Sequence, residues 1–496
     1  MQPEKTAIEF EDLRISYAAF DQQIDRFARL LNSLGCQRGD RIACLGENTP
    51  DQLAMFFACA RQGLILVTLN WRLAGPEHAY QIRNSGARLI FADPAFQQQI
   101  DQFHGEFSHV VRVSTTSDTR DGWQSLPYLL SSVENSDQAL PASGSEDDPV
   151  LLVYTSGTTG RPKGAVLTQR NILWNAINGA HSHDMTSRDV ILTNLPLFHV
   201  GGLNNQTTPA LHAGATVILQ RRFEPDTMLQ AIETRRPTLT LAVPAVLNAL
   251  ITHPDWPTTD ISSLRLLMAG STTVPTAMIE QVHARGLPVG QIYGSTETCP
   301  IAIVLRADDA MNKIGSCGKP VPHCQARIID RDGQDVPDGQ PGELLVRGAN
   351  VFREYWNNPA ATEESFLDGW FRTGDIAHQD EDGFYFIDDR SKDVIISGGE
   401  NIYPAELEQV LAHEHRLTEA AVIGRQDDRW DEVPVVVAAL REGEIMSAED
   451  VRALFTDRLA RYKHPHDVIF VDALPRNALG KILKFELRAA MQEGRL

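Results

Sequence analysis

The chain has 496 residues, of which 42% are hydrophobic and 22% are charged. This composition is that of a globular protein, and the length exceeds what one hydrophobic core usually serves, so two or more domains are expected. The formal net charge of -20, from 65 acidic and 45 basic residues, argues against a nucleic-acid-binding protein and against an anionic membrane as a general partner.

Neither the N-terminus nor the cysteines point to export. The first residues lack a basic segment followed by an apolar one, and no uninterrupted apolar stretch reaches the length of a membrane span. A cytoplasmic location is therefore expected. The six cysteines form neither a CxxC pair nor a zinc-type cluster, so we expect reduced thiols that lie mostly in the core.

Helical and extended patterns alternate through the first hundred residues. Apolar residues recur at helical spacing between residues 20 and 34, and residues 41–45 then have the pattern of a strand. The pattern continues with helix-like segments at 51–61 and 75–82 and with extended segments at 64–68 and 87–92. Such alternation is typical of α/β architecture with parallel strands.

A hydroxyl- and glycine-rich loop follows the apolar run 150–153. Its candidate phosphate-binding residues are Thr155, Ser156, Gly157, Thr158, Thr159, Gly160 and Lys163. A strand that ends in such a loop offers a phosphate several backbone N–H groups, hydroxyls and one lysine charge. A Walker A loop needs Gly-Lys followed by Ser or Thr, whereas two residues separate Gly160 from Lys163 here. The loop predicts a nucleotide site of another kind.

Glycine and proline become frequent between residues 315 and 348, where short extended runs predict a β-rich subdomain. A polar stretch at 388–393 is the expected domain boundary. We therefore predict an N-terminal domain over 1–389, a hinge at 390–393 and a C-terminal domain over 394–496.

The C-terminal domain is predicted to be a small α+β unit. Its helix-like runs are 405–412 and 448–458, and its extended runs are 420–424 and 433–440.

Four motifs follow one another along the chain: the loop 154–164, then 293–297 (YGSTE), 370–375 (WFRTGD) and 475–481 (PRNALGK). Alone, each would also suit a surface turn. In this order they resemble the adenylate-forming (AMP-binding) superfamily, which includes acyl-CoA synthetases. The resemblance implies a large α/β N-terminal domain with parallel-strand layers and a β-rich subdomain, followed by a small mobile α+β C-terminal domain.

The resemblance also implies roles for the nucleotide-site residues. Tyr293, preceding Gly294, would lie against adenine, Thr296 would touch phosphate, and Glu297 would bind Mg²⁺, a hard cation that prefers carboxylate oxygen. Asp375 would accept hydrogen bonds from the ribose hydroxyls, because an ionised carboxylate only accepts.

Further roles follow for charged and glycine residues near the C-terminal domain. Arg390 would reach the ribose and phosphate region. Lys481 would offset negative charge when the substrate carboxylate attacks the α-phosphate. Lys392 resembles the hinge position. Gly398 and Gly399 would flank a tunnel for the thin pantetheine arm of coenzyme A.

The acyl pocket is expected to be apolar. Its candidate residues are His199, Gly202, Ala269, Gly270, Cys299 and Ile301. Amino-acid-activating relatives have aspartate where His199 stands, so an α-amino acid would lack a partner for its cation. The resemblance implies that His199 acts in catalysis as a gate or as a plane against the carboxylate, and a packed, non-catalytic histidine is the alternative. The segment containing Ala269 and Gly270 departs from the usual pattern of the family, which leaves its contacts open.

These features predict an ATP- and Mg²⁺-dependent acid–CoA ligase for a fatty, aryl or cinnamic monocarboxylic acid, similar to bacterial fatty-acyl and feruloyl-type CoA ligases. Two alternatives stay open: an enzyme that loads the acyl group onto a carrier protein, and a non-catalytic nucleotide-binding protein. The combination of Glu297, Asp375, Arg390 and Lys481 argues against the non-catalytic alternative, because a mere binder has little need of the mobile lysine. The resemblance is also compatible with a homodimer.

Overall fold

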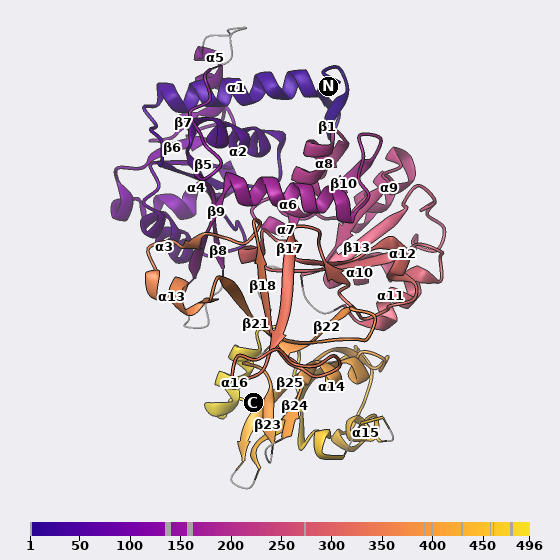
Figure 1. Cartoon of the computed structure of the whole chain (residues 1–496). Helices are drawn as coiled ribbons and strands as arrows, with labels where there is room; N and C mark the ends of the chain where they lie inside the picture. Colours follow the sequence, from indigo (N-terminus) through magenta and orange to yellow (C-terminus); the bar gives the residue numbers. More distant parts are fainter. Residues whose placement is uncertain are drawn as a thin grey trace.

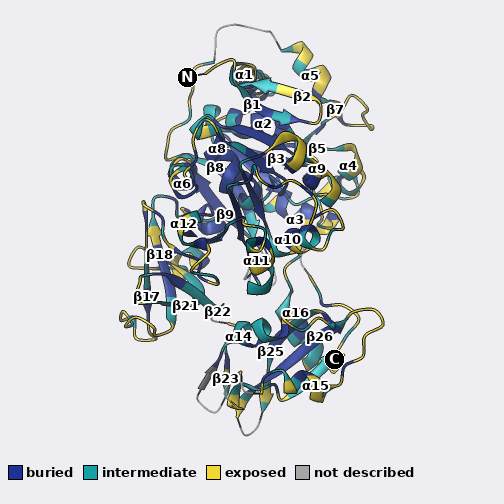
Figure 2. Ribbon diagram, turned by 90° about the vertical axis from the view of Figure 1, so that its right-hand side faces the viewer, coloured by how far each residue is buried: buried dark blue, intermediate teal, exposed yellow. Residues whose placement is uncertain are grey.

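The computed structural model describes residues 2–133, 140–155, 162–271, 274–390, 392–397, 400–427, 430–456, 458–459, 461–476 and 480–496, without the side chains of Glu400 and Asn401. A large upper part is followed by a smaller lower part that contains the C-terminus (Figure 1). Buried strands form the interior of both parts, and helices with exposed outer faces surround them (Figure 2). The predicted α/β fold is confirmed, whereas the exact domain limits stay predictions.

An eight-stranded sheet lies in the large part, in the order β19-β9-β8-β4-β3-β5-β6-β7. Its strands are β3 (Arg41–Leu45), β4 (Ile65–Leu69), β5 (Leu89–Ala92), β6 (Val111–Ser114), β7 (Gln124–Ser125), β8 (Pro149–Thr155), β9 (Lys163–Thr168) and β19 (Glu354–Tyr355). From β8 to β7 all neighbours are parallel, and β9 pairs antiparallel with both β8 and β19. Strand β8 therefore stands where the direction of pairing changes.

A nine-stranded sheet lies beside it, in the order β16-β15-β14-β13-β12-β10-β11-β1-β2. Its strands are β1 (Thr6–Phe10), β2 (Leu13–Ser16), β10 (Val190–Thr193), β11 (Thr216–Leu219), β12 (Leu239–Ala242), β13 (Leu266–Gly270), β14 (Val289–Tyr293), β15 (Ile303–Leu305) and β16 (Lys319–Pro320). The stretch from β14 to β1 is parallel. One large buried cluster of apolar side chains spans both sheets.

Two smaller antiparallel-rich sheets complete the chain. The first contains β17 (Cys324–Ile329), β18 (Gly342–Gly348), β20 (Phe366–Leu367), β21 (Trp370–Gln379) and β22 (Tyr385–Arg390). The second, in the lower part, contains β23 (Ile395–Ser397), β24 (Glu400–Ile402), β25 (Leu417–Asp427), β26 (Asp431–Leu440) and β27 (Asp467–Phe470). The predicted β-rich subdomain and the small α+β unit are both present.

The helices occupy the connections between strands. They are α1 (Tyr17–Ser33), α2 (Pro50–Gln62), α3 (Gly75–Ser85), α4 (Pro94–Asp101), α5 (Leu126–Ser132), α6 (Gln169–Ser182), α7 (Val200–Gly202), α8 (Thr208–Ala213), α9 (Pro225–Arg235), α10 (Pro244–Ile251), α11 (Thr276–His283), α12 (Ala307–Ala310), α13 (Pro359–Glu364), α14 (Pro404–Leu411), α15 (Ala448–Ala453) and α16 (Lys484–Gln492). Three 3-10 turns are η1 (His104–Phe107), η3 (Thr296–Thr298) and η4 (Arg461–Lys463), and η2 (Leu203–Thr207) is a π-helix.

Local sequence explains where the helices begin and end. The side chain of Thr49 accepts a hydrogen bond from Gln52 N at the start of α2, and Pro50 occupies the first turn, where its missing N–H costs nothing. Gly63 ends the helix in the left-handed conformation at φ 64°. Signals of this kind are why the helices predicted in the first hundred residues are confirmed.

One predicted helix is shorter than expected. The run 448–458 was predicted as helix-like throughout, but α15 ends at Ala453. Beyond it, the backbone N–H groups of Phe455 and Thr456 donate to carbonyl oxygens three residues earlier, so the chain continues as tight turns. The fully buried ring of Phe455 keeps the apolar periodicity that suggested a longer helix.

The cysteines and the helices agree with two further expectations. All six cysteines are free thiols, and five of them are buried. Within the described ranges, no helix combines the length and the apolar character that crossing a membrane requires.

The lower part has its own hydrophobic cores, which share no residue with those of the large part. Phe455→Ala should therefore lower the free energy of unfolding of this part by roughly 3–5 kcal/mol, through lost burial and a residual cavity. Hydrogen exchange measured by mass spectrometry should show faster exchange in β25 and β26 and unchanged exchange in the large part. Phe485→Ala, at a ring that is 55% exposed, is the matched control; equal effects of the two changes would contradict the expectation.

Candidate active site

The predicted nucleotide residues begin at the C-terminal end of β8, the edge of a parallel sheet at which ligands commonly bind. Thr155 ends β8 and lies opposite Lys163, the first residue of β9, and its hydroxyl donates to the Lys163 carbonyl at 3.4 Å. The structure thus brings the two ends of the loop together. The intervening candidates Ser156, Gly157, Thr158, Thr159 and Gly160 lie outside the described residues.

Lys163 also lies near Glu297 through a shared tyrosine. The Lys163 Nζ is 5.1 Å from the centre of the Tyr355 ring, and the Tyr355 hydroxyl donates to Glu297 Oε1 at 2.7 Å. Burial, followed by the negative charge of Glu297, raises the pKa of Tyr355, so the hydroxyl keeps its proton and remains a donor. Tyr355 carries no motif that could have identified it from sequence. It holds a buried carboxylate at the phosphate end of the site.

The turn that carries Glu297 is packed tightly against its own chain. Thr296 and Glu297 are buried in the 3-10 turn η3, and the Ser295 N–H donates to Thr298 Oγ1 at 2.8 Å. A Cβ on Gly294 would overlap the carbonyl oxygen of Pro300. Gly294 therefore has a packing role, and the turn presents Glu297 on a fixed backbone.

A second charged group forms where β14 meets the β21–β22 pair. The Tyr293 hydroxyl donates to Asp375 Oδ2 at 2.6 Å, and Arg390 Nε lies 2.6 Å from Asp375 Oδ1. Asp375 and Arg390 are opposite each other in the antiparallel register. Burial, followed by the charge of Asp375, raises the pKa of Tyr293 well above its usual value. Three predicted residues from separate motifs thus come together.

Lys481 reaches this group from the lower part of the molecule. Desolvation by the surrounding protein, and then the positive charge of Arg390, lower the pKa of Lys481 to about 8, although the side chain stays partly exposed. The preceding Gly480 is left-handed at φ 80°, and a Cβ placed on it would lie 3.5 Å from the Cβ of Ala245 in α10. The loop therefore lies against the large part.

Arg476 holds the loop that carries Lys481. This role was not predicted from the sequence. Its guanidinium donates to the Gly480 carbonyl and forms an ion pair with Glu419 of β25, with Nε at 2.9 Å from Glu419 Oε2. The pairing fixes the loop to the sheet of the lower part. Only the fold brings β25 to this loop, so residue spacing gave no signal.

The predicted hinge residue Lys392 lies just after the end of β22, in a turn, and its side chain is exposed. Gly398 and Gly399 lie outside the described residues.

The histidine of the predicted acyl segment is held neutral. Burial, followed by the positive charge of Arg72, lowers the pKa of His199 to about 4. Its ring centre lies 5.2 Å from that of Phe198, which in turn lies under the Arg72 guanidinium. A neutral His199 offers no charge to a substrate ammonium or carboxylate. This agrees with an apolar acid and with a packing or gating role.

The remaining acyl candidates are positions of close packing. Ala269, Cys299 and Ile301 are fully buried. A Cβ on Gly270 would lie 2.5 Å from the Ile292 carbonyl oxygen, and one on Gly202 would overlap that of Pro196. Burial raises the pKa of Cys299, which makes the thiol a poor nucleophile and agrees with its expected role as a wall residue.

The segment after Gly202 contains buried polar residues that were not predicted from the sequence. The π-helix η2 contains buried Asn204, Asn205 and Gln206, and Asn204 Nδ2 donates to the sulfur of Cys299 at 3.6 Å. Short π-helical segments often occur at functional sites. Among the described residues, the Oδ1 atoms of buried Asn194 and Asn205 accept no hydrogen bond. Each of these oxygens thus keeps an unused acceptor in the described structure.

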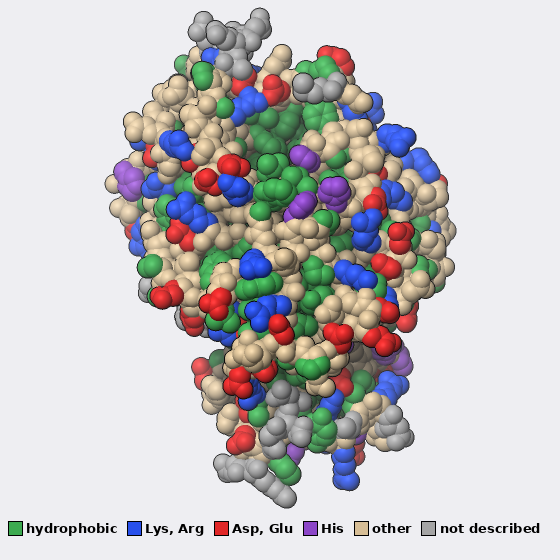
Figure 3. Space-filling model, viewed as in Figure 1, with side chains coloured by type: hydrophobic (Ala, Val, Ile, Leu, Met, Phe, Trp, Pro, Cys, Tyr) green, Lys and Arg blue, Asp and Glu red, His purple; other side chains and the backbone are tan. Residues whose placement is uncertain are grey.

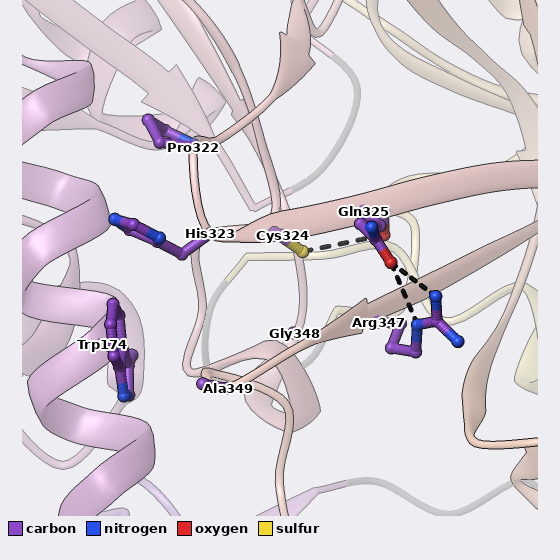
Figure 4. A pocket seen from close by; sticks show the side chains of 8 residues that line it. All are labelled: Trp174, Pro322, His323, Cys324, Gln325, Arg347, Gly348 and Ala349. Atoms are coloured by element: carbon purple, nitrogen blue, oxygen red, sulfur yellow. Dashed lines mark hydrogen bonds between the residues drawn. The ribbon is translucent and has the colours of Figure 1, made fainter.

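A hollow of about 360 Å³ lies elsewhere, between α6 and the facing ends of β17 and β18 (Figure 4). The Trp174 and His323 rings line it with centres 4.7 Å apart, and Arg347 lies at its other end, donating to Gln325 Oε1. In Figure 3, histidine side chains gather beside an apolar patch on this face. None of the predicted site residues that the structure describes lines the hollow.

Comparison with protein families gives two matches. The model described as AMP-binding enzyme matches residues 1–356, and the model described as AMP-binding enzyme C-terminal domain matches residues 406–481. The first match alone covers well over half of the chain.

Named relatives align over almost the whole length. An indoleacetate–CoA ligase of Aromatoleum aromaticum is 48% identical over 490 residues, which are 98% of this chain and 95% of the relative. A feruloyl-CoA synthase of an Amycolatopsis species is 39% identical over 488 residues, covering 98% and 96%.

Solved structures show the same fold. The ATP-bound form of MatB from Rhodopseudomonas palustris superposes with a TM-score of 0.90 at 30% identity, covering 100% of this chain and 97% of that one. The form of MatB without ligand gives a TM-score of 0.80 at 31% identity, with the same coverage. The arrangement described above is thus closer to the ATP-bound form.

The lowered pKa of Lys481 can be tested by amine labelling. Reaction with acetic anhydride, followed by mass spectrometry across pH, should be half-maximal for Lys481 near pH 8, because only the neutral amine reacts. Lys313, whose pKa is raised to about 12 by hydrogen bonds to Asp380 and Asp382, is the internal comparison. Arg390→Gln should move the Lys481 midpoint to higher pH; labelling of both lysines at the same pH would refute the lowered pKa.

Proposed function

The chain belongs to the AMP-binding enzyme family, and we propose that its acid substrate is an aryl monocarboxylic acid with a hydrogen-bonding ring group. The protein is an ATP-dependent, AMP-forming acid–CoA ligase. The acid and ATP give an acyl-adenylate and pyrophosphate, and the thiol of coenzyme A then displaces AMP to give the thioester. Because its relatives are CoA ligases, loading of a carrier protein is set aside as the alternative.

The observation that carries this mechanism is the meeting of Lys481 with Asp375 and Arg390 across the two parts of the chain. In the first step a substrate carboxylate oxygen bonds to the α-phosphorus while the bond to pyrophosphate breaks. The ammonium of Lys481 offsets the negative charge that builds on the phosphoryl oxygens. Asp375 accepts from the ribose hydroxyls, and Arg390 orients Asp375.

The residues at the phosphate end fit a bound Mg²⁺. Glu297 supplies a buried carboxylate oxygen, a ligand that this hard cation prefers, and the Tyr355 hydroxyl fixes its orientation. When bound, Mg²⁺ neutralises charge on the leaving pyrophosphate. Lys163, with the backbone of the loop, contacts the phosphates.

Three features support an aryl acid. The relatives that are 48% and 39% identical are named for indoleacetate and ferulate, an indole N–H donor and a phenolic O–H donor respectively. We propose that the buried Oδ1 atoms of Asn194 and Asn205, which accept no hydrogen bond within the described structure, accept such donors. His199 is neutral, so the pocket holds no partner for an amino group. A purely aliphatic chain would leave both amide oxygens unpaired.

Other roles inferred from the sequence remain part of the proposal. Rotation at Lys392 exposes the adenylate to coenzyme A, whose pantetheine arm passes Gly398 and Gly399. The domain limits 1–389, 390–393 and 394–496, a homodimer and a cytoplasmic location stay predictions.

Lys481→Ala tests the adenylation step. In the proposed mechanism the Lys481 ammonium is the charge that the lower part brings to the α-phosphate. Its loss should slow acid-dependent ATP–pyrophosphate exchange roughly 100-fold or more. Thioester formation from synthetic acyl-adenylate and coenzyme A should change far less. Lys319→Ala, at an exposed lysine of the large part, is the control; unchanged exchange in Lys481→Ala would remove Lys481 from the mechanism.

A panel of acids tests the substrate class. Coenzyme A-dependent AMP release should be fastest with arylacetic or cinnamic acids that carry a ring N–H or O–H, and slower with fatty acids. Indole-3-acetate and naphthalene-1-acetate form a matched pair with and without the donor. Asn205→Leu should reduce the preference for the first about tenfold, the value of one buried hydrogen bond. Equal rates for the pair in the unaltered enzyme would refute the hydrogen bond to the ring, and faster turnover of the fatty acids would refute the aryl class.

A further inference from the structure

Asp389 is a buried carboxylate that the proposed reaction does not use. It lies on β22, next to Arg390, and is 7% exposed. Successive residues of a strand point to opposite faces. Arg390 faces Asp375 and the nucleotide side, so Asp389 faces away from it, toward α14 and α16 of the lower part.

The carboxylate of Asp389 binds the start of a helix beyond the hinge. Its Oδ2 accepts a hydrogen bond from the backbone N–H of Ala405 in the first turn of α14 at 2.8 Å, and its Oδ1 accepts from its neighbour's N–H at 2.7 Å. The N-cap residue Tyr403 has no side-chain hydrogen bond that would serve this turn. Asp389 therefore supplies the acceptor that the helix lacks, and its charge suits the positive end of the helix dipole.

A buried lysine connects the same contact to the loop of Lys481. Lys484, the first residue of α16, lies close enough to Asp389 for its charge to lower the pKa of that carboxyl, and its Nζ lies 2.8 Å from Glu408 Oε1 of α14. Only two residues separate it from Lys481. The contact thus fixes α14, α16 and the attached loop relative to β22.

We propose that Asp389 is a positioning residue that latches the lower part in the orientation for adenylation. The latch is the contact of Asp389, which precedes the hinge residue Lys392, with Ala405 and Lys484, which follow it. Any rotation at Lys392 must therefore break this contact. The likeness to the ATP-bound form of MatB supports this assignment of the orientation. The inference rests on the two-step function proposed above.

Burying the charge of the Asp389 carboxylate is unfavourable, which opposes the contact and allows it to break. Burial outweighs Lys484 and both N–H donors and raises the pKa of Asp389 to about 6, and Glu408 adds a smaller effect in the same direction. At neutral pH the carboxylate is ionised and its desolvation weakens the contact. In the proposed scheme the contact forms for adenylation and breaks for thioester formation.

The first test compares the two half-reactions. Asp389→Ala should shift the ratio of thioester formation from synthetic acyl-adenylate to ATP–pyrophosphate exchange roughly tenfold toward the thioester, as expected for losing a hydrogen bond to a charged group. Asp388→Ala is the matched control, because Asp388 accepts from His378 within the β21–β22 pair at 2.8 Å and its bond does not cross the hinge. A ratio that is unchanged in Asp389→Ala, or that changes equally in Asp388→Ala, would overturn the latch.

A second test needs no activity and so separates this inference from the proposed function. Cysteines introduced as Ala245→Cys and Gly480→Cys fall within the Cβ separation that a disulfide requires, about 3.5–4.5 Å. In a glutathione buffer the equilibrium fraction of this disulfide measures how often the loop lies against α10. Added Asp389→Ala should lower it several-fold, whereas added Asp388→Ala should not. An unchanged fraction would refute the latch even if both half-reactions proceed.

Asp389→Asn guards against a trivial loss of folding. Its side-chain oxygen can still accept from the Ala405 N–H, so both readouts should lie between those of the unaltered enzyme and Asp389→Ala, with an unchanged melting temperature. Values for Asp389→Asn beyond those of Asp389→Ala would contradict a contact made through the acceptor oxygen.

Discussion

The antiparallel pairing of β21 with β22 is the constraint on which the site depends. It sets Asp375 opposite Arg390, and Tyr293 from the nine-stranded sheet then closes the group with a 2.6 Å hydrogen bond. A carboxylate buried to this degree requires such partners, because its unpaired charge would be costly. The pairing therefore fixes a charged centre between two sheets, and the lower part of the molecule adds its lysine to that centre.

The two faces of the β21–β22 pair contact different parts of the molecule. The face of Arg390 serves the nucleotide side, and the face of Asp389 meets the helices beyond the hinge. In the scheme proposed above, neighbouring residues thus act on catalysis and on the orientation of the small domain without sharing a partner. The alternation of a strand is enough to keep these two functions apart.

Sequence reasoning predicted what depends on local pattern. The α/β alternation could be read from spacing and residue type, whereas Asp375 and Lys481 were identified through the resemblance of their motifs to the family. Tyr355, Arg476 and Asp389 could not be identified in either way, because their partners come from distant segments whose approach only the fold determines. The π-helix η2 was missed for a different reason, since its sequence LNNQT contains a single apolar residue and carries no periodic signal.

Main-chain atoms, rather than side chains, form part of the wall around the predicted acyl site. The Cβ directions of Gly202 and Gly270 are each covered by a backbone carbonyl, and Gly294 in the neighbouring turn has the same relation to Pro300. A substitution cannot enlarge the site at these positions, because glycine has no side chain to shorten. A larger side chain would not fit there unless the backbone moved. Changes in the size of the accepted acid must therefore come from positions with side chains, such as Asn205 and Ile301. The backbone around the predicted acyl site would stay the same.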